Sequence, residues 1–130
     1  MNERFGKDNV IALATMENNV PSVRYVNAYY ENKVFYIITY ETSNKMKQIK
    51  KNLEVGIAGE WFSAHGTGMN LGYFCKKENT EIAKKLRAVF SSWIDNGHND
   101  FSDKNTCILC ILLTDGILFS NGSRYDVDFR

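Results

Sequence analysis

The residues with the clearest chemistry are the hydroxyl and ammonium groups of one short segment. Residues 39–52, TYETSNKMKQIKKN, contain four lysines, and three Ser or Thr side chains precede them. Thr42 or Ser43 can cap a helix here, and Lys45 would lie in its first turn. The unpaired N–H groups at a helix start attract phosphate groups. The segment is therefore either a solvated helix face or part of a site for an anion.

Arg24 offers a second cation for the same site. It lies in VPSVRYVNAYY, residues 20–30, an apolar and aromatic stretch where a charge is costly unless it is paired or bound to a ligand. If Glu31 and Asn32 form a two-residue hairpin loop, Arg24 faces Thr39 across two strands. This register predicts a guanidinium beside a hydroxyl just ahead of the lysines. A carboxylate partner for Arg24 is the alternative.

Strands must position these groups. Runs rich in Val, Ile, Tyr and Phe predict them, and the expected strands cover residues 10–17, 20–30, 33–40, 54–62, 65–74, 106–114, 116–120 and 124–129. The expected turns fall at Ser63-Ala64, Asp115-Gly116 and Asn121-Gly122.

Two helices complete the expected fold. Apolar residues recur at helical spacing in a short helix and in a longer one, which begins at Asn79 or Thr80 and ends near Gly97. These apolar positions are Met46, Ile49 and Leu53 in the short helix and Ile82, Leu86, Val89 and Phe90 in the longer one. The pattern predicts a mainly β fold with minor α, a closed or nearly closed antiparallel barrel. An open α+β sandwich is the alternative.

Length and charge limit the class of protein. A chain of 130 residues suits one domain, residues 1–130. Lys plus Arg is 16 and Asp plus Glu is 15, so no overall field favours nucleic acid or an anionic membrane as a partner. No apolar run approaches the ~20 residues that span a bilayer, and the N-terminus lacks the features of a signal peptide. We expect a cytoplasmic protein.

The cysteines predict no metal site. There are three, an odd number that suits free thiols in a reducing compartment. Cys107 and Cys110 form a C-x-x-C, but they lie in a predicted buried strand, where residues three apart point to opposite faces. Two thiolates that face opposite ways cannot share one metal ion.

The order of these pieces resembles the pyridoxamine 5'-phosphate oxidase-like family of split β-barrel flavoproteins, in particular its small general-stress-protein and nitroimidazole-resistance-like branches. The match is specific through residues 10–60 and rests on architecture beyond them. The matching residues are Leu13-Ala14-Thr15, Pro21, Arg24-x-Val26, an aromatic strand that ends at Thr39, and Ser43-x-Lys45-x-x-Gln48-Ile49-x-x-Asn52.

The resemblance implies a homodimer that binds FMN in two clefts at the subunit interface. Arg24 and Lys45 would hold the FMN phosphate, helped by Ser43 and Thr39. Residues 25–27 would pass along the isoalloxazine ring or the ribityl chain, and the backbone of residues 38 and 39 would face the ring. Gln48 would contact the flavin or stabilise the helix. The full set implied for the cofactor is Arg24, Tyr25, Val26, Asn27, Ile38, Thr39, Ser43, Lys45 and Gln48.

The resemblance also implies an oxidoreductase that reduces a small organic substrate with NAD(P)H, with the flavin carrying the redox chemistry. The larger pyridoxamine phosphate oxidases extend further at the C-terminus, and this chain stops at Arg130, so oxidation of vitamin B6 is not expected. The alternatives are a flavin-binding or stress-response protein without turnover, and the same barrel with heme or deazaflavin F420. His65, which precedes Gly66-Thr67, is a structural residue or a cofactor contact, and we favour the structural role.

Overall fold

A computed structural model describes residues 9–17, 20–40, 43–51, 53–59, 62–90, 105–120 and 123–128. Within these ranges the chain forms seven strands, two α-helices and one 3-10 turn. Their bounds are β1 Asn9–Glu17, β2 Val20–Glu31, β3 Val34–Tyr40, α2 Asn44–Lys51, β4 Glu54–Ala58, β5 Phe62–Tyr73, η1 Lys77–Asn79, α3 Thr80–Val89, β6 Thr106–Ser120 and β7 Ser123–Asp128.

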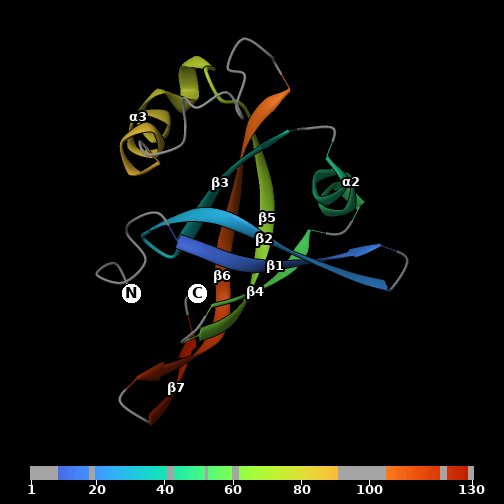
Figure 1. Ribbon diagram of the computed structural model, residues 1–130, viewed down its shortest axis with the longest axis vertical. Coiled ribbons are helices and arrows are strands. Elements are labelled where there is room, and N and C mark those ends of the chain that lie inside the picture. Colours follow the sequence, from blue (N-terminus) through green and yellow to red (C-terminus); the bar gives the residue numbers. More distant parts are fainter. Residues whose placement is uncertain are drawn as a thin grey trace.

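The described strands form one antiparallel barrel. Their order is β3-β2-β1-β4-β5-β6-β7, and an additional pairing of β3 with β6 closes six of them into a ring. The seventh, β7, extends from the ring along the far end of β6 (Figure 1). Closure pairs the strand edges that an open sheet would expose. The predicted mainly β barrel with one short and one longer helix is confirmed, and the open sandwich is wrong.

The hairpin of β2 and β3 differs from its predicted register. Tyr29 pairs with Tyr36 and Glu31 with Val34, so the loop is Asn32-Lys33 rather than Glu31-Asn32. Both loop residues have positive φ, 50° and 71°, as a type I′ turn requires. The shift of one position arises because Asn32 takes the first place of the turn, and the pairing of Arg24 with Thr39 is therefore wrong.

The same two strands separate soon after this turn. The ladder between β2 and β3 holds three residue pairs, and from Val34 to Tyr40 the other edge of β3 pairs with β6. Figure 1 shows β2 and β3 leaving their hairpin in different directions. Residues 24–27 of β2 and 38–40 of β3 therefore lie beyond their common ladder, and we refer to this region as the β2–β3 split.

The turn expected at Asp115-Gly116 is absent, because β6 runs unbroken from Thr106 to Ser120. Gly116 serves a close approach of strands instead, since a Cβ there would lie 2.8 Å from the carbonyl oxygen of Ser63 on β5. The register shifts beside it: His65 faces Asp115 but Gly66 faces Leu113. Thr114 is thus the extra residue of a β-bulge.

The other two turn predictions had different outcomes. Ala58 pairs with Ser63, and the Gly59 N–H donates to the Phe62 carbonyl at 2.9 Å, so residues 60–61 connect β4 to β5 and the expected turn at Ser63-Ala64 is wrong. Ser120 faces Ser123, which confirms the connection at 121–122 between β6 and β7.

The core has two parts that β6 separates. On one side of β6, its residues Cys107, Leu109, Ile111 and Leu113 pack inside the barrel. On the other side, Ile108 of β6 packs with Leu86, Phe90 and Phe74 under α3. Cys110 shares the parity of Ile108 and lies opposite Tyr36. The two cysteines of the C-x-x-C therefore face opposite sides, as predicted. Burial raises the pKa of Cys110 to about 11.

Most of the apolar residues predicted for the two helices face the core. Met46 and Ile49 of α2 are buried against the barrel, whereas Leu53 lies past the helix end and is half exposed. In α3, Leu86 is buried and Ile82 and Val89 pack beside it. The predicted end at Gly97 lies outside the described residues.

Candidate cofactor site

Arg24 and Gln48 meet at the end of the barrel that α2 covers. Arg24 is opposite Leu13 in the ladder with β1, which turns its side chain toward the inside. Its Nη1 donates to Thr15 Oγ1 at 2.7 Å and to the Leu13 carbonyl at 3.4 Å, and its Nη2 donates to Gln48 Oε1 at 3.3 Å. Three elements, β1, β2 and α2, thus fix the direction of one guanidinium.

Thr15 and Gln48 complete this network. Both side chains are buried, and Thr15 Oγ1 donates to Gln48 Oε1. The sequence left open whether Gln48 touches a ligand or stabilises the helix, and here it orients Arg24. Thr15 was matched only as part of a motif, although a Thr two residues after a buried Leu on the same strand face signals a buried hydroxyl that needs a partner.

A pair of hydroxyls lies where β3 leads into α2. Thr39 Oγ1 and Ser43 Oγ are 3.4 Å apart, and the Met46 N–H donates to Ser43 Oγ at 3.4 Å. Both contacts are long, which leaves lone pairs and hydroxyl protons for other partners. The contact with Met46 makes Ser43 the cap of α2, as one of the two predicted candidates. The other, Thr42, lies outside the described residues, as does Asn52.

Lys45 brings a second charge close to Arg24. Burial lowers the pKa of the Lys45 ammonium, and the positive charge of Arg24 lowers it further, while Cys107 opposes the shift. Burial also lowers the pKa of Arg24. In the part of the chain that the structure describes, neither side chain forms an ion pair with a carboxylate. Among the described residues, Arg24 and Lys45, the cation pair of this site, therefore lie near each other without a carboxylate counter-charge.

The remaining predicted residues lie along the β2–β3 split with different exposures. Tyr25 is 79% exposed on the outer face, Val26 packs against the barrel core, and Asn27 is partly buried. The Ile38 side chain packs toward α3, which leaves its backbone as the group that could meet a ligand. The structure thus brings Arg24 near Lys45 and Thr39 near Ser43, at the start of α2, but spreads the strand residues along the split.

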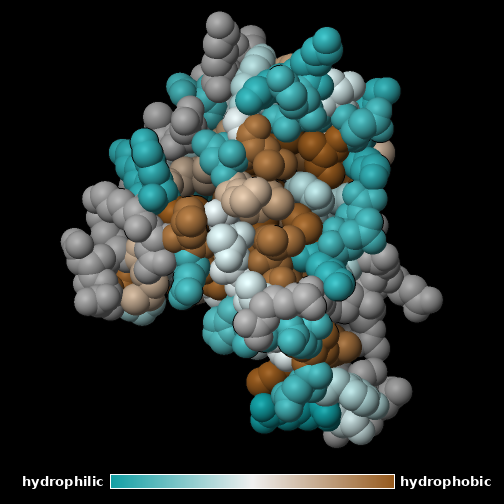
Figure 2. Space-filling view, turned by 180° about the vertical axis from the view of Figure 1, so that it is seen from behind, coloured by the Kyte–Doolittle hydropathy of each residue, from teal (hydrophilic) through white to brown (hydrophobic). Residues whose placement is uncertain are grey.

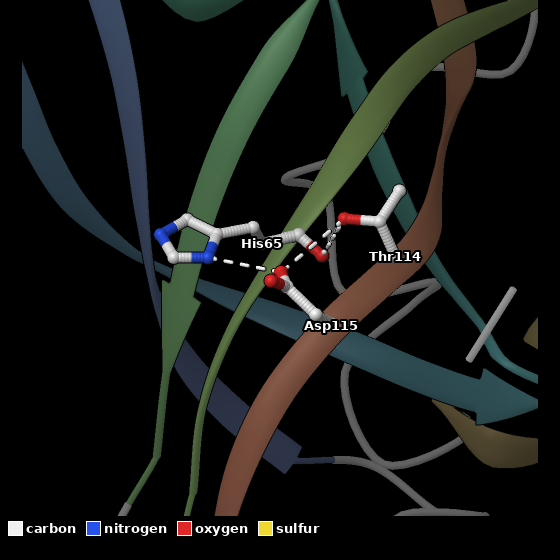
Figure 3. A network of polar contacts seen from close by, with 3 residues as sticks. All are labelled: His65, Thr114 and Asp115. Atoms are coloured by element: carbon white, nitrogen blue, oxygen red, sulfur yellow. Dashed lines mark hydrogen bonds and ion pairs between the residues drawn. The ribbon is translucent and has the colours of Figure 1, made fainter. Parts of the chain in front are cut away.

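His65 belongs to a separate network. Its Nδ1 lies 3.1 Å from Asp115 Oδ1, and Thr114 Oγ1 donates to the His65 carbonyl at 3.2 Å (Figure 3). These contacts connect β5 to the bulge in β6. The His65 side chain is 75% exposed, and its hydrogen-bond partners among the described residues, Asp115 and Thr114, belong to this bulge, which favours the structural role expected for it.

Two kinds of feature are absent from the described residues. No group of three or more His, Cys, Asp or Glu side chains there could hold a metal ion. No helix in the same ranges has the length and apolar character needed to cross a membrane.

Solved structures share this fold. A NimC/NimA family protein from Clostridium acetobutylicum has 23% identity and a TM-score of 0.70, with 95% of this chain and 86% of that chain covered. General Stress Protein 26 from Bacillus anthracis has 15% identity and a TM-score of 0.69, covering 98% and 100%. A protein from Listeria innocua, provisionally assigned as a pyridoxamine 5'-phosphate oxidase, has 12% identity and a TM-score of 0.65, covering 88% and 89%.

Other matched structures are named for different ligands: a FAD-binding protein from Mesorhizobium loti, an F420 reductase and a heme binding protein from Mycobacterium smegmatis. No protein-family model and no curated protein matches the sequence. The identities are low, so what these proteins share with the chain is the fold. The chain has the split β-barrel fold of the pyridoxamine 5'-phosphate oxidase-like proteins.

Proposed function

We propose that the protein is an FMN-binding flavoprotein whose cation pair, Arg24 and Lys45, holds the cofactor phosphate. The observation that carries this proposal is the absence of a carboxylate partner for either side chain among the described residues. Two partly buried cations repel each other and lose solvation. A phosphate dianion between them offsets both costs and accepts charge-assisted hydrogen bonds.

The surroundings of the cation pair suit the same group. Thr39 and Ser43 present hydroxyls 3.4 Å apart, and the start of α2 adds backbone N–H groups and the positive end of its dipole. Thr15 and Gln48 hold the guanidinium in place from the other side. An FMN phosphate at this point would leave the ribityl chain and ring to follow the β2–β3 split past residues 25–27.

In this proposal the protein is an oxidoreductase that reduces a small organic substrate with NAD(P)H. FMN would supply hydride and electron transfer, while the chain would bind, orient and shield it. The backbone of Ile38 and Thr39 would face the ring, and Tyr25, Val26 and Asn27 would line its path. Its three cysteines are free thiols, which suits a cytoplasmic location.

The outer face of β1 and β2 supports a homodimer as part of the proposal. Val10, Val23 and Tyr25 are each more than 60% exposed, at 62%, 66% and 79%. Cross-strand pairing places Tyr25 beside Ala12 and Val23 beside Ala14 on this one face. A contiguous exposed apolar face suits a protein interface. Because Tyr25 also borders the β2–β3 split, a partner here would cover the cofactor.

Binding of FMN and riboflavin to the same protein tests the phosphate role directly. We expect FMN to remain bound through desalting, with its yellow absorbance, and to bind at least about thirtyfold more tightly than riboflavin, because riboflavin lacks the phosphate that the cation pair would hold. Equal affinities would contradict the proposal.

Light scattering of the Val23→Glu variant should show a monomer if the face of β1 and β2 forms the dimer.

Turnover is tested separately. Anaerobic stopped-flow mixing of the FMN-loaded protein with NADH or NADPH should bleach the flavin absorbance rapidly if the protein is an oxidoreductase. A stable yellow protein would instead support the flavin-binding alternative without turnover. Spectra after incubation with heme or F420, ligands for which two matched structures are named, test whether this barrel prefers another cofactor.

A further inference from the structure

The flank of α2 that faces away from Arg24 borders a hollow of about 580 Å³. This volume lies within the roughly 300–1,000 Å³ that small-molecule sites occupy. Residues two apart on a helix lie about 160° apart around its axis. Lys47 and Lys50, which line this hollow, are thus nearly opposite Lys45 and Gln48, which contribute to the FMN site. The two sites use different flanks of one helix.

The walls of the hollow are apolar. Met46 and Ile49 of α2 are buried at 5% and 3% exposure, and Leu53 and Met69 stand half exposed at 52% and 47%. Together these four side chains give the hollow an apolar lining on which an apolar ligand could pack. Figure 2 shows hydrophobic side chains gathered in the middle of the rear face of the molecule, with hydrophilic ones around them.

The backbone around the hollow is closely fitted. The Gly68 N–H donates to the Leu53 carbonyl at 2.7 Å, which ties the end of α2 to β5. A Cβ on Gly68 would lie 2.8 Å from Ile49 Cγ2. Only glycine lets the helix approach the strand so closely here, so the shape of the hollow is set before any ligand arrives.

The polar groups of the hollow are hydrogen-bond donors. Lys47 and Lys50 are exposed neighbours at i and i+3, and neither has a carboxylate partner in the ranges that the structure describes. Asn70 is the remaining polar side chain, and its Oδ1 already accepts from the Gly72 N–H at 2.8 Å. The Asn70 NH2 group can donate to a ligand, and its Oδ1 keeps a second lone pair. Two ammonium groups and an amide donor are complementary to a carboxylate, which only accepts.

We propose that this hollow binds a medium-chain fatty carboxylate. Its acyl chain would lie between Met46, Ile49 and Met69, and its carboxylate would accept from Lys47 and Lys50 at the mouth. The apolar walls and the two ammonium groups at the mouth together favour a ligand that is apolar along its length and anionic at one end. This proposal is independent of FMN binding.

Decanoate, below its micelle concentration, tests the location. The chain has four methionines, and with methyl-¹³C methionine we expect the Met46 and Met69 resonances to shift with saturation while that of Met16, on β1, stays in place. The absence of a saturable shift, or equal shifts of all the methionines, would overturn the proposal.

The length of the acyl chain tests the apolar part. A buried methylene contributes a free energy that corresponds to about a fourfold gain in affinity, so the dissociation constant should fall about sixteenfold from octanoate to decanoate. Decanol should bind more weakly than decanoate, and 0.5 M NaCl should remove part of that difference because the lysines are exposed. Equal binding of decanol and decanoate would contradict the role of the lysines.

Matched variants complete the test. Lys47→Gln with Lys50→Gln should weaken decanoate binding about tenfold, and Lys84→Gln, an exposed lysine on α3, should leave it unchanged. Met69→Glu should abolish binding, whereas Leu112→Glu, a site of similar exposure at 48% on β6, should not. FMN affinity is measured on each variant, so a failure here leaves the proposed flavin site standing. If light scattering shows that Met69→Glu dissociates a dimer while decanoate never binds, a second copy covers this surface and the proposal is wrong.

Discussion

The two flanks of α2 carry the same kind of side chain in opposite settings. On one flank, Lys45 is partly buried beside Arg24, and its pKa is lowered by burial and by that neighbouring charge. On the other, Lys47 and Lys50 are exposed at the mouth of an apolar hollow. The difference lies in what each lysine faces. A buried ammonium beside a guanidinium needs an anion for electrostatic reasons, whereas an exposed one costs nothing in water.

The largest expected effect is on FMN affinity. The double change Arg24→Ala and Lys45→Ala removes both members of the cation pair, so the dissociation constant for FMN should rise about a hundredfold or more, as measured by quenching of flavin fluorescence. The matched change Lys47→Ala and Lys50→Ala on the other flank should alter it less than about threefold. Similar losses from both pairs would mean that the lysine segment acts through its total charge.

A smaller effect is expected from Thr15→Val, which keeps the shape but removes the hydroxyl that joins Arg24 to Gln48. FMN should bind about tenfold more weakly, since Arg24 loses one of its orienting contacts. Binding of riboflavin should hardly change, because it has no phosphate for Arg24 to hold. Thr15→Ser should restore FMN binding; if both variants bind FMN like the original chain, Thr15 has no role in positioning.

Gly68→Ala tests the close packing on the hollow side. The added methyl would meet Ile49 Cγ2 at 2.8 Å, so the free energy of unfolding in urea should fall by about 1–3 kcal/mol. Met69→Ala, at a half-exposed position nearby, should cost less than about 1 kcal/mol. Equal stability of Gly68→Ala and the original chain would show that α2 can move away from β5 without loss.

The smallest expected effect is a pH dependence of stability and of FMN affinity, and it arises from Lys45 on the flank of α2 that faces Arg24. The folded protein lowers the pKa of Lys45 below its ordinary 10.5, so the folded state releases this proton at a lower pH than the unfolded chain does. Without FMN, stability therefore gains from Lys45 as pH rises from the lowered pKa toward 10.5. FMN affinity should fall over the same range, because the phosphate loses a positive partner.

The Lys45→Arg variant is the control for this dependence. An arginine stays charged throughout that range, so the fall in FMN affinity should disappear in Lys45→Arg and persist in Lys50→Arg. Persistence of the fall in both variants would assign it to another group.

The sequence predicted the class of fold and the hairpin-connected strands because their apolar patterns are local. It misplaced Asp115-Gly116 as a turn, since Gly116 is needed for contact with Ser63, which lies on a different strand. It also paired Arg24 with Thr39, because it placed the two-residue hairpin loop one position too early in the chain. The error at Gly116 comes from a tertiary contact that no short window contains, whereas the register error comes from the choice of the two turn residues within the hairpin.

The candidate site shows the same limit in another form. Arg24, Ser43 and Lys45 were recognisable as polar groups in apolar surroundings or at a helix start. The hydrogen bonds that connect Thr15, Gln48 and Arg24 span three elements. Neither Thr15 nor Gln48 is unusual in its own segment. A buried polar network of this kind becomes visible only when the fold brings its members together.

The β2–β3 split has a kinetic consequence. Seven residue pairs connect β3 to β6, but only three connect β3 to β2. The β2–β3 pairing is therefore the weaker of the two, and it lies on the side where the cofactor would bind. Small openings of the barrel should occur there first, while the core behind β6 stays packed. A cofactor could then be taken up by the folded protein without global unfolding. Hydrogen exchange should show faster exchange of the backbone amides in the β2–β3 ladder, at residues 29–31, than in the β3–β6 ladder.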